Sequence, residues 1–296
     1  MPTYFRHERD GEARVGAWLD HGDAYEICGV LHPDGPHDAD DCLISALLSR
    51  TEPGARIEPG RILPVIGRPR NVFGAPVNYQ AHSGELGARS PNPGSTTREL
   101  GLFVKAGGSV SGAADPIELP DRPDREFQYE GEIAIVIGRP GLDIDPADAL
   151  GHIAGFTGAL DVTMRLEEGK REERSMRKSF RTFTPTGPAV LPLTDPAQAT
   201  SLELTLSLNG ERRQHGKLED LIVDVPGLVA LASSVVALEP GDLILTGTPA
   251  GVSGLHRGDV VELAVTGLPV LRLDVTVRGD NVIGRGDNGN GRGGHE

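Results

Sequence analysis

The stretch FQYEGEIAIVIG, residues 127–138, constrains the fold of this chain more than any other. Successive side chains of a β-strand point to opposite faces, so Glu130 and Glu132 are predicted to project from one face. The other face is apolar and is predicted to face the core, with Tyr129, Ile133, Ile135 and Ile137.

Two neighbouring carboxylates in a buried sheet repel each other and lose hydration. One of them then protonates unless a cation lies between them. A hard divalent ion such as Mg²⁺, Mn²⁺ or Ca²⁺ suits carboxylate oxygens. On the spacing alone, a solvated strand edge that carries two ordinary glutamates remains the alternative.

Composition limits the class of protein. The net charge of −14 argues against nucleic acid or an anionic membrane as a partner. No apolar run approaches the roughly 18 residues of a membrane span, and the N-terminus has no apolar signal region, so a cytoplasmic protein is expected. The 40 glycines, 23 prolines and 4% aromatic residues favour short strands and turns over long helices.

Short apolar runs separated by turn residues predict a β-rich fold with a few helices. We expect a small N-terminal domain over 1–65, a main domain over 66–279 and a disordered glycine-rich tail over 280–296.

Local signals predict particular elements. Asn209-Gly210 predicts a hairpin. A short helix is expected over 43–49, and a charged helix over 164–176. Asp224 is placed to cap a third helix, predicted over 225–238, whose apolar stripe is Leu228, Leu231, Ala232 and Val235.

The segment NYQAHSGE, residues 78–85, contains a candidate general base. One helical turn would put His82 and Glu85 on the same face. A carboxylate beside an imidazole raises its basicity, as a base near neutral pH requires. A surface pair is the alternative. The long loop that follows, residues 86–100, is typical of a lid.

Three further segments carry candidate residues. Asp161 closes a glycine-spaced strand and is either a third oxygen ligand or the N-cap of a following helix. Lys178 opens a short, partly apolar run. Gly247-Thr248-Pro249 predicts a tight turn with free backbone N–H groups that can cradle a carboxylate.

Together and in this order, these segments resemble the fumarylacetoacetate hydrolase family over about residues 70–277. The matching motifs are NYQAHSGE, LFVK, YEGEIAIVIG, LDVTMR, KSF and LTGTPAGV. The resemblance implies a β-rich α+β fold, in which a mixed β-roll catalytic domain that usually dimerises follows a small N-terminal domain.

The resemblance also implies roles for particular residues. It places Mg²⁺ or Mn²⁺ on Glu130, Glu132 and Asp161, and it assigns water activation to His82 and Glu85. It implies substrate contacts for Lys178 and Thr248, with Lys105 and Arg165 as further pocket residues. The stretch before the histidine, FGAPVN, lacks the extra acidic ligand of some larger members, so three carboxylates are implied here. The insert between LDVTMR and KSF adds Glu167 and Glu168 near the pocket mouth, where they could repel acidic substrates.

The function expected from this resemblance is metal-dependent hydrolysis of a C–C bond in a 2,4-dioxo acid, through a metal-bound enolate. The substrate would be a small oxo acid of aromatic compound catabolism, and the protein a homodimer. A decarboxylase, an isomerase (tautomerase) or a hydratase acting on a 2-oxo or 2-hydroxydienoic acid is the alternative. A non-catalytic scaffold that binds a small acid is a third reading.

Overall fold

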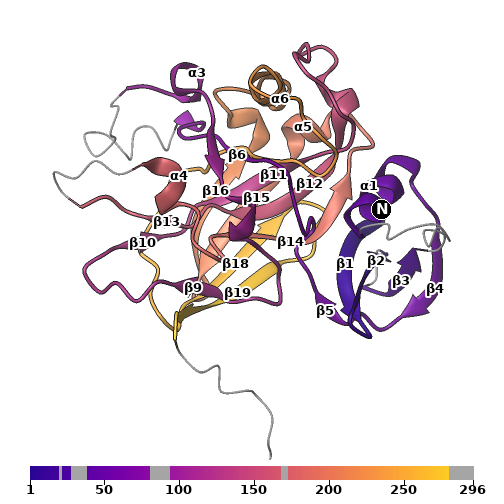
Figure 1. Ribbon diagram of the computed structural model, residues 1–296, viewed down its shortest axis with the longest axis horizontal. Coiled ribbons are helices and arrows are strands. Elements are labelled where there is room, and N and C mark those ends of the chain that lie inside the picture. The colour runs from indigo at the N-terminus through magenta and orange to yellow at the C-terminus, as the bar shows by residue number, and fades with distance from the viewer. Residues whose placement is uncertain (20–21, 28–38, 81–93, 168–172, 280–296) are drawn as a thin grey trace, which may run out of the picture.

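A computed structural model describes residues 1–19, 22–27, 39–80, 94–167 and 173–279. His82, Glu85, Glu168, most of the expected lid and the expected tail lie outside these residues. Most strands belong to one 12-stranded sheet with the order β4-β3-β2-β1-β14-β12-β11-β17-β6-β7, while β5 pairs with β1 and β8 with β14 (Figure 1). Its strands are β1 (Thr3–Arg9), β2 (Glu12–Trp18), β3 (Ala24–Ile27), β4 (Pro53–Ile57), β5 (Arg61–Ile62), β6 (Val72–Gly74), β7 (Phe103–Lys105), β8 (Val110–Ser111), β11 (Gly131–Ile137), β12 (Ile153–Leu160), β14 (Thr184–Pro192) and β17 (Leu243–Leu245).

Two smaller sheets complete the β-structure. The five-stranded sheet has the order β16-β15-β18-β19-β9, and β10 pairs with β13. These strands are β9 (Ile117–Leu119), β10 (Phe127–Gln128), β13 (Thr163–Met164), β15 (Glu203–Leu208), β16 (Glu211–Lys217), β18 (Val260–Val265) and β19 (Leu271–Val277). Parallel pairs (β17/β6, β14/β8 and β19/β9) occur beside antiparallel ones. The expected β-rich α+β fold with mixed sheets is therefore confirmed.

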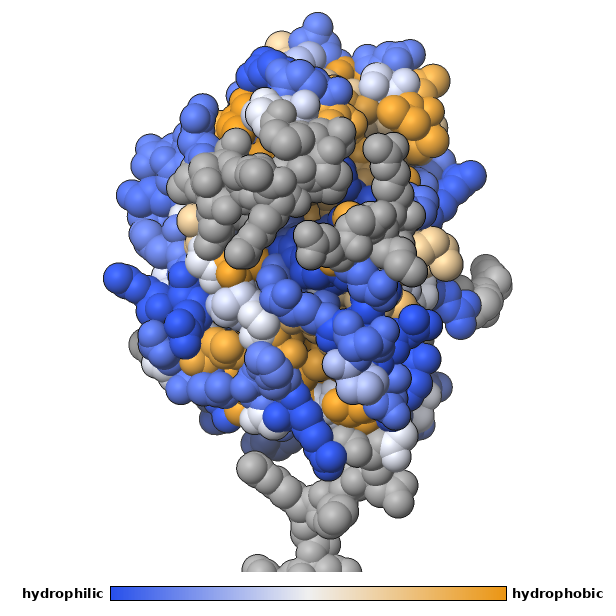
Figure 2. Space-filling view, turned by 90° about the vertical axis from the view of Figure 1, so that its left-hand side faces the viewer, coloured by the Kyte–Doolittle hydropathy of each residue, from blue (hydrophilic) through white to orange (hydrophobic). Residues whose placement is uncertain are grey.

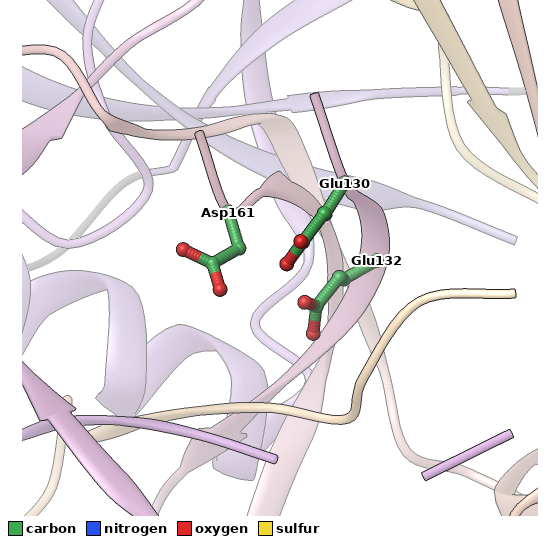
Figure 3. A group of neighbouring side chains, drawn as sticks. All are labelled: Glu130, Glu132 and Asp161. Carbon is green, nitrogen blue, oxygen red and sulfur yellow. The ribbon is translucent and has the colours of Figure 1, made fainter. Parts of the chain in front are cut away.

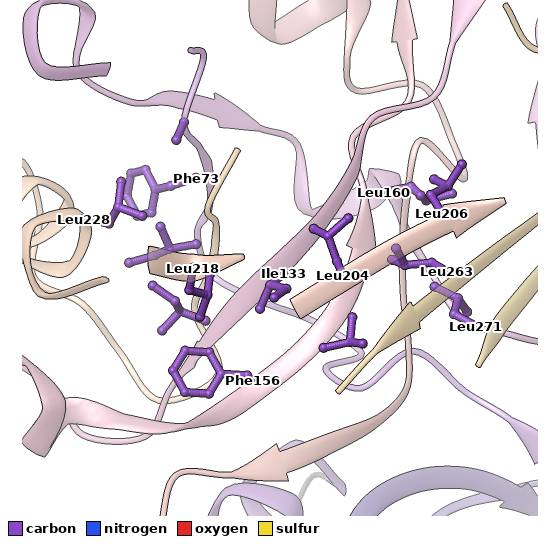
Figure 4. Packing of buried hydrophobic residues seen from close by; sticks show 14 of the residues in the cluster. Phe73, Ile133, Phe156, Leu160, Leu204, Leu206, Leu218, Leu228, Leu263 and Leu271 are labelled. Carbon is purple, nitrogen blue, oxygen red and sulfur yellow. The ribbon is translucent and has the colours of Figure 1, made fainter. Parts of the chain in front are cut away.

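The main core lies between the large sheet and the five-stranded sheet. Strand β11 and the five-stranded sheet contribute buried side chains to one cluster, in which Ile133 packs with leucines of β15, β18 and β19 (Figure 4). Residues of β11 alternate between two clusters: Ile133, Ile135 and Ile137 belong to this one, and Ala134 and Val136 to a second. Both faces of β11 are buried, so the reading of a solvated strand edge is wrong.

Helices are short. They are α1 (Ala39–Ser49), α3 (Thr97–Leu100), α4 (Arg174–Arg177), α5 (Gln198–Ser201) and α6 (Val225–Ser233), with 3₁₀ turns at Gly107–Ser109, Ala149–His152 and Leu218–Asp220. The predicted helix over 43–49 lies inside α1. The expected helix over 164–176 is wrong, because residues 163–164 form β13 and the helix α4 begins only at Arg174. The pairing of Met164 with Phe127 of β10 holds the start of this range in a strand.

Two turn predictions can be checked in detail. The Asn209-Gly210 hairpin is confirmed, with φ of 53° and 82° at the two turn residues. Helix α6 begins as expected, because the Asp224 side chain accepts a hydrogen bond from the Gly227 N–H. It ends at Ser233 rather than 238, and Val235 is 74% exposed instead of completing the apolar stripe. The chain leaves the helix there so that Leu238 can bridge to Gly141.

The N-terminal strands β1–β4 and helix α1 form a region at one side of the molecule (Figure 1). Strand β1 joins this region to the rest through β14, with Tyr4 opposite Val190. The buried Arg6 forms an ion pair with Asp40, whose carboxylate also accepts hydrogen bonds from the Gly67 and Arg68 N–H groups. The division of the chain at residue 65 stays a prediction. Within the described ranges, no helix combines the length and apolar character that crossing a membrane requires.

Asp242 connects the start of β17 to the start of β6. It is fully buried, and its carboxylate accepts hydrogen bonds from the Asn71 N–H, the Asn71 side-chain amide and the Glu239 N–H. Replacement by alanine leaves these donors without a partner, so Asp242→Ala should lower the free energy of unfolding by about 3 kcal/mol. Urea denaturation measures this loss. The control Asp274→Ala removes an exposed aspartate of β19 and should change stability by less than about 0.5 kcal/mol; equal losses would contradict the anchoring role.

Candidate metal centre

Three acidic side chains converge in the interior. One ligand oxygen from each of Glu130, Glu132 and Asp161 lies within 4.8 Å of the others (Figure 3). The pairing of β11 with β12 places Gly131 opposite Leu160, and the Asp161 N–H then donates to the Glu130 carbonyl at 2.8 Å. The solvent-exposed fractions of Glu130, Glu132 and Asp161 are 6%, 1% and 1%. The antiparallel register thus brings together the E-x-E pair and an aspartate that lies 29 positions after Glu132 in the sequence.

Glu130 is held by two cations. The Arg165 guanidinium donates to one carboxylate oxygen at 2.7 Å, and Lys178 Nζ donates to the other at 2.9 Å. Lys178 Nζ also donates to the Thr163 hydroxyl at 2.8 Å and to Asp161 Oδ2. Lys178 therefore bridges two of the three acidic residues from a buried position at the end of α4.

Lys105, at the end of β7, holds the other oxygen of Asp161. Its Nζ donates to Asp161 Oδ1 at 2.5 Å and to the Phe183 carbonyl at 2.9 Å. Burial lowers the pKa of Lys105, and the charge of Asp161 acts in the opposite direction. Both lysines singled out in the sequence thus lie at this site, in direct contact with the acidic group.

Glu132 has no cation on its carboxylate within the described ranges. Its Oε2 accepts a hydrogen bond from the Gly247 N–H at 2.6 Å. Burial, followed by the charges of Asp161 and Glu130, raises the pKa of Glu132 well above its usual range. A divalent cation beside these carboxylates would reverse that effect, because it favours their ionised forms.

The acidic group fits a hard divalent ion. An ionised carboxylate has about four acceptor positions on its two oxygens. Each oxygen of Asp161 uses one position for its lysine partner, so further acceptor capacity remains on the same oxygens. All three donors are carboxylate oxygens, the ligand type that suits Mg²⁺ and Mn²⁺. Water or substrate oxygens would fill the remaining positions.

Several sequence expectations change here. No helix follows Asp161, so the reading of it as an N-cap is wrong. The predicted free N–H of Gly247 is also wrong, since it donates to Glu132. Thr248 is buried, and its hydroxyl donates to the Gly131 carbonyl and accepts from the Gln214 amide. The proposed roles of Thr248, Lys178, Lys105 and Arg165 toward substrate stay predictions, as do those of His82 and Glu85, which the structure does not describe.

Two buried residues of the site were not among the sequence predictions. Tyr79 is 2% exposed, its hydroxyl has no hydrogen-bond partner in the described part of the chain, and burial together with Glu132 raises its pKa. Arg177, next to Lys178, is also buried. The motifs around His82 and Lys178 contained these residues, but nothing in their local pattern distinguished them. Gly247, which the sequence placed in a tight turn, has φ of 97° and supplies the N–H that orients Glu132.

Such a buried group of hard oxygen ligands, flanked by lysines and an arginine, is typical of a metal-dependent enzyme. Residues 71–276 match the family described as fumarylacetoacetate (FAA) hydrolase, C-terminal. The chain is 35% identical over 230 residues to a maleylpyruvate hydrolase of Aquipseudomonas alcaligenes, covering 74% of this chain and 78% of that protein. It is 34% identical over 230 residues to a mitochondrial oxaloacetate decarboxylase of Dictyostelium discoideum, covering 76% and 98%.

A solved structure extends this similarity to the whole fold. The maleylpyruvate hydrolase from Sphingobium sp. SYK-6, in complex with manganese(II) ion and pyruvate, has a TM-score of 0.73 and 29% identity, covering 94% of this chain and 99% of that chain. The chain belongs to the fumarylacetoacetate hydrolase family, and the family assignment made from the six motifs is confirmed. The family's relatives named above act on oxo acids with different outcomes, so membership alone leaves the reaction open.

Gly247 offers a test of how Glu132 is positioned. A Cβ at residue 247 would lie 2.8 Å from Asn78 Cβ, whereas a Cβ at Gly279, which has the same φ of 97°, meets nothing within 4 Å. Both alanine variants should lose about 1–2 kcal/mol of stability from backbone strain. Gly247→Ala alone should also weaken Mn²⁺ binding by about 10- to 100-fold, because the N–H that orients Glu132 moves. Calorimetric titration of both variants with Mn²⁺ measures this; unchanged affinity in Gly247→Ala would disprove the orienting role.

Glu132 predicts a pH dependence of metal binding. The pKa of Glu132 is higher in the folded protein than in the unfolded chain. In metal-free protein, the contribution of the protonated Glu132 to folding stability is therefore complete below the unfolded pKa and is lost as pH rises through the folded pKa. Metal binding requires the ionised carboxylate and releases the proton. The increase in Tm with Mn²⁺ should therefore be larger at pH 8 than at pH 5.5. In the pH range where Glu132 titrates, the affinity for Mn²⁺ should rise about tenfold for each pH unit.

Thermal denaturation of Glu132→Gln provides the comparison. This variant should show little Tm increase with Mn²⁺ at either pH, and without metal it should be more stable than the wild type at pH 8. The control Glu211→Gln removes an exposed carboxylate that pairs with Arg213 and should behave as the wild type. A pH-independent Mn²⁺ effect in the wild type would contradict proton release from Glu132.

Proposed function

We propose that this protein is a divalent-metal-dependent hydrolase that cleaves a C–C bond in a 2,4-dioxo acid of the acylpyruvate type. The observation that carries the proposal is the buried group of Glu130, Glu132 and Asp161 with Lys178 bridging two of its members. A related structure holds manganese(II) and pyruvate, and pyruvate is the acid that cleavage of an acylpyruvate releases. The relative from Aquipseudomonas alcaligenes is a maleylpyruvate hydrolase.

The acidic group would hold Mg²⁺ or Mn²⁺, which acts as a Lewis acid on the 2-oxo oxygen of the substrate when bound. Lys178 contributes a buried ammonium beside this position. Its three protons now serve Glu130, Asp161 and Thr163, and a shift of one of them toward the substrate would stabilise negative charge on an enolate oxygen. Arg165 donates a hydrogen bond to Glu130 and holds its carboxylate in place.

The reaction requires a base that activates water. We assign this role to His82, with Glu85 raising its basicity. The water oxygen bonds to C4 as its proton passes to His82, and the C3–C4 bond then breaks. Its electron pair forms the enolate of pyruvate, and protonation at C3 completes two acids from one substrate and one water. Hydrolysis is favoured over simple enolisation because the chain contains both members of this base pair.

A second candidate function is decarboxylation of a 2-oxo diacid. The similarity to an oxaloacetate decarboxylase, which extends over 98% of that protein, favours it. It would use the same acidic group and Lys178 but no activated water, so it does not need His82. Keto–enol isomerisation would share this independence of His82. We expect a homodimer in either case.

A spectrophotometric assay separates these functions. With Mg²⁺, the wild type should remove the enol absorbance of an acylpyruvate and yield two acids, and EDTA should abolish this reaction. His82→Ala should reduce the rate by about 10² to 10⁴, the usual contribution of a general base. Glu132→Ala should abolish metal-dependent turnover, while the exposed-site variant Glu211→Gln should keep it.

The outcomes distinguish the candidates. Turnover of oxaloacetate but not of acylpyruvates, with His82→Ala fully active, would replace the hydrolase by the decarboxylase. No turnover of either substrate, together with no Mn²⁺ binding, would reject the enzymatic proposal itself and favour a non-catalytic scaffold.

A further inference from the structure

Gln214 of β16 is a polar side chain in the interior of the protein. It is 1% exposed, whereas its neighbours Arg213 and His215 are exposed. By contrast, hydrophilic side chains cover most of the face that carries α3 and α4, where water solvates them (Figure 2). A buried side-chain amide loses its hydration and is tolerated when protein atoms satisfy its hydrogen-bonding groups. The partners of Gln214 therefore indicate what its burial achieves.

The amide of Gln214 joins two segments of the metal centre. Its Oε1 accepts a hydrogen bond from the Gly131 N–H at 2.9 Å, and its Nε2 donates to Thr248 Oγ1 and to the Pro249 carbonyl, both at 2.8 Å. The Gly131 N–H can only donate and the Pro249 carbonyl can only accept, so these partners fix which end of the amide is the oxygen.

This orientation also fixes the proton of the Thr248 hydroxyl. The hydroxyl oxygen accepts from Gln214, so its own proton is free to be donated to the Gly131 carbonyl, 2.9 Å away. The N–H of Gly131 belongs to the peptide group that links it to Glu130, and its carbonyl to the peptide group that links it to Glu132. Each of the two peptide groups between the glutamates is therefore held by one side chain.

The neighbouring strand does not reach these two peptide groups. Strand β17 pairs with residues 134–136 of β11, and the next residue after it, Thr246, donates its N–H to the Ile133 carbonyl. A buried backbone N–H or carbonyl without a partner costs about as much as a lost hydrogen bond. Gln214 and Thr248 supply side-chain partners at Gly131, where pairing with β17 has ended.

The backbone of β16 directs Gln214 toward Gly131. Leu206 of β15 lies opposite Gln214. The next residue of β15, Ser207, lies opposite Arg212, so that β16 contains one extra residue, Arg213. Such a β-bulge changes the direction of a neighbouring side chain, and bulges are common beside active sites.

Two glycines allow the segments to approach closely. A Cβ at residue 131 would lie 2.8 Å from Leu206 Cδ1 and 3.1 Å from Gln214 Oε1. A Cβ at Gly251, in the segment that follows Thr248, would lie 1.9 Å from the carbonyl oxygen of the bulge residue Arg213. The five-stranded sheet and the segment after β17 therefore both pack directly against the backbone that carries the acidic pair.

We propose that Gln214 is a positioning residue of the metal centre. Together with Thr248 it holds Gly131, and it thereby sets the placement of Glu130 and Glu132 relative to each other. The inference rests on the part of the proposed function that assigns a divalent ion to the acidic group, and it does not depend on which reaction follows. Gln214 acts through the backbone of Gly131 and contacts neither the ion nor the substrate.

Binding of Mn²⁺ to two matched variants tests the proposal. Gln214→Met removes the amide and keeps a side chain of similar length. Gln198→Met removes a glutamine of α5 whose amide accepts from the Thr194 and Asp195 N–H groups and donates to the Pro192 carbonyl. Both variants should lower the Tm of the metal-free protein. In calorimetric titrations below both Tm values, Gln214→Met should weaken Mn²⁺ binding by about 10- to 100-fold, and Gln198→Met should bind as the wild type.

Variants of Thr248 provide a second reading, which also serves if Gln214→Met does not fold. Thr248→Val removes the hydroxyl from the Gly131 carbonyl and should weaken Mn²⁺ binding by about tenfold, whereas Thr248→Ser keeps the hydroxyl and should retain the wild-type affinity. Because both side chains act through Gly131, their effects should not add. The double variant Gln214→Met/Thr248→Val should bind Mn²⁺ within about threefold of the weaker single variant.

Three results would overturn the positioning role. The first is wild-type affinity for Mn²⁺ in folded Gln214→Met, and the second is an equal loss of affinity in Gln198→Met, which would indicate a general effect of destabilisation. The third is equal affinity in Thr248→Val and Thr248→Ser, because the hydroxyl would then have no part in holding the acidic pair.

The experiment also separates this proposal from the proposed reaction. Mn²⁺ binding that depends on Gln214, in a protein that cleaves no acylpyruvate, supports the positioning role and rejects the hydrolase. Cleavage of acylpyruvates with no effect of Gln214→Met on Mn²⁺ affinity supports the hydrolase and rejects the positioning role. A wild type that binds no Mn²⁺ rejects both.

Discussion

The structure depends on the burial of three carboxylates at one point of a closely packed sheet. Removing such groups from water costs several kcal/mol for each ion unless nearby charges and hydrogen bonds compensate. Lys178, Lys105 and Arg165 compensate Glu130 and Asp161, whereas among the described residues Glu132 accepts a hydrogen bond from the Gly247 N–H and has no cation on its carboxylate. A divalent ion bound beside Glu132 would supply the positive charge that these residues do not place there.

The fold creates this arrangement through strand register. Strand β11 lies inside the large sheet between β12 and β17, and its two faces pack into different core clusters. Its pairing with β12 continues from Gly131 and Leu160 to Glu130 and Asp161, where the regular strands end. The acidic residues therefore project from a rigid support at the end of the strand pair, where the lysines of β7 and α4 can reach them. Rigid support of this kind keeps metal ligands in place at little entropic cost.

Relatives with the same family fold carry out different reactions on small oxo acids, among them hydrolysis of maleylpyruvate and decarboxylation of oxaloacetate. A metal ion that polarises a 2-oxo acid would suit both kinds of reaction, since each breaks a C–C bond whose electron pair can be held as an enolate. The difference must then come from groups around the metal centre: those that activate water, and those that select the far end of the substrate. In our proposal, the groups that activate water in this chain are His82 with Glu85.

The sequence by itself determined those features that follow from a local pattern of residues. Alternation along residues 129–137 identified the acidic pair and the core face, Asn209-Gly210 identified a hairpin, and the order of six motifs identified the family and pointed to Asp161. Only the tertiary structure decided which partners these residues have. The hydrogen bond from the Gly247 N–H to Glu132 and the early end of α6 depend on contacts between segments far apart in the chain. The predicted helix over 164–176 begins too early, because Met164 pairs with Phe127 of β10, and α4 begins at Arg174.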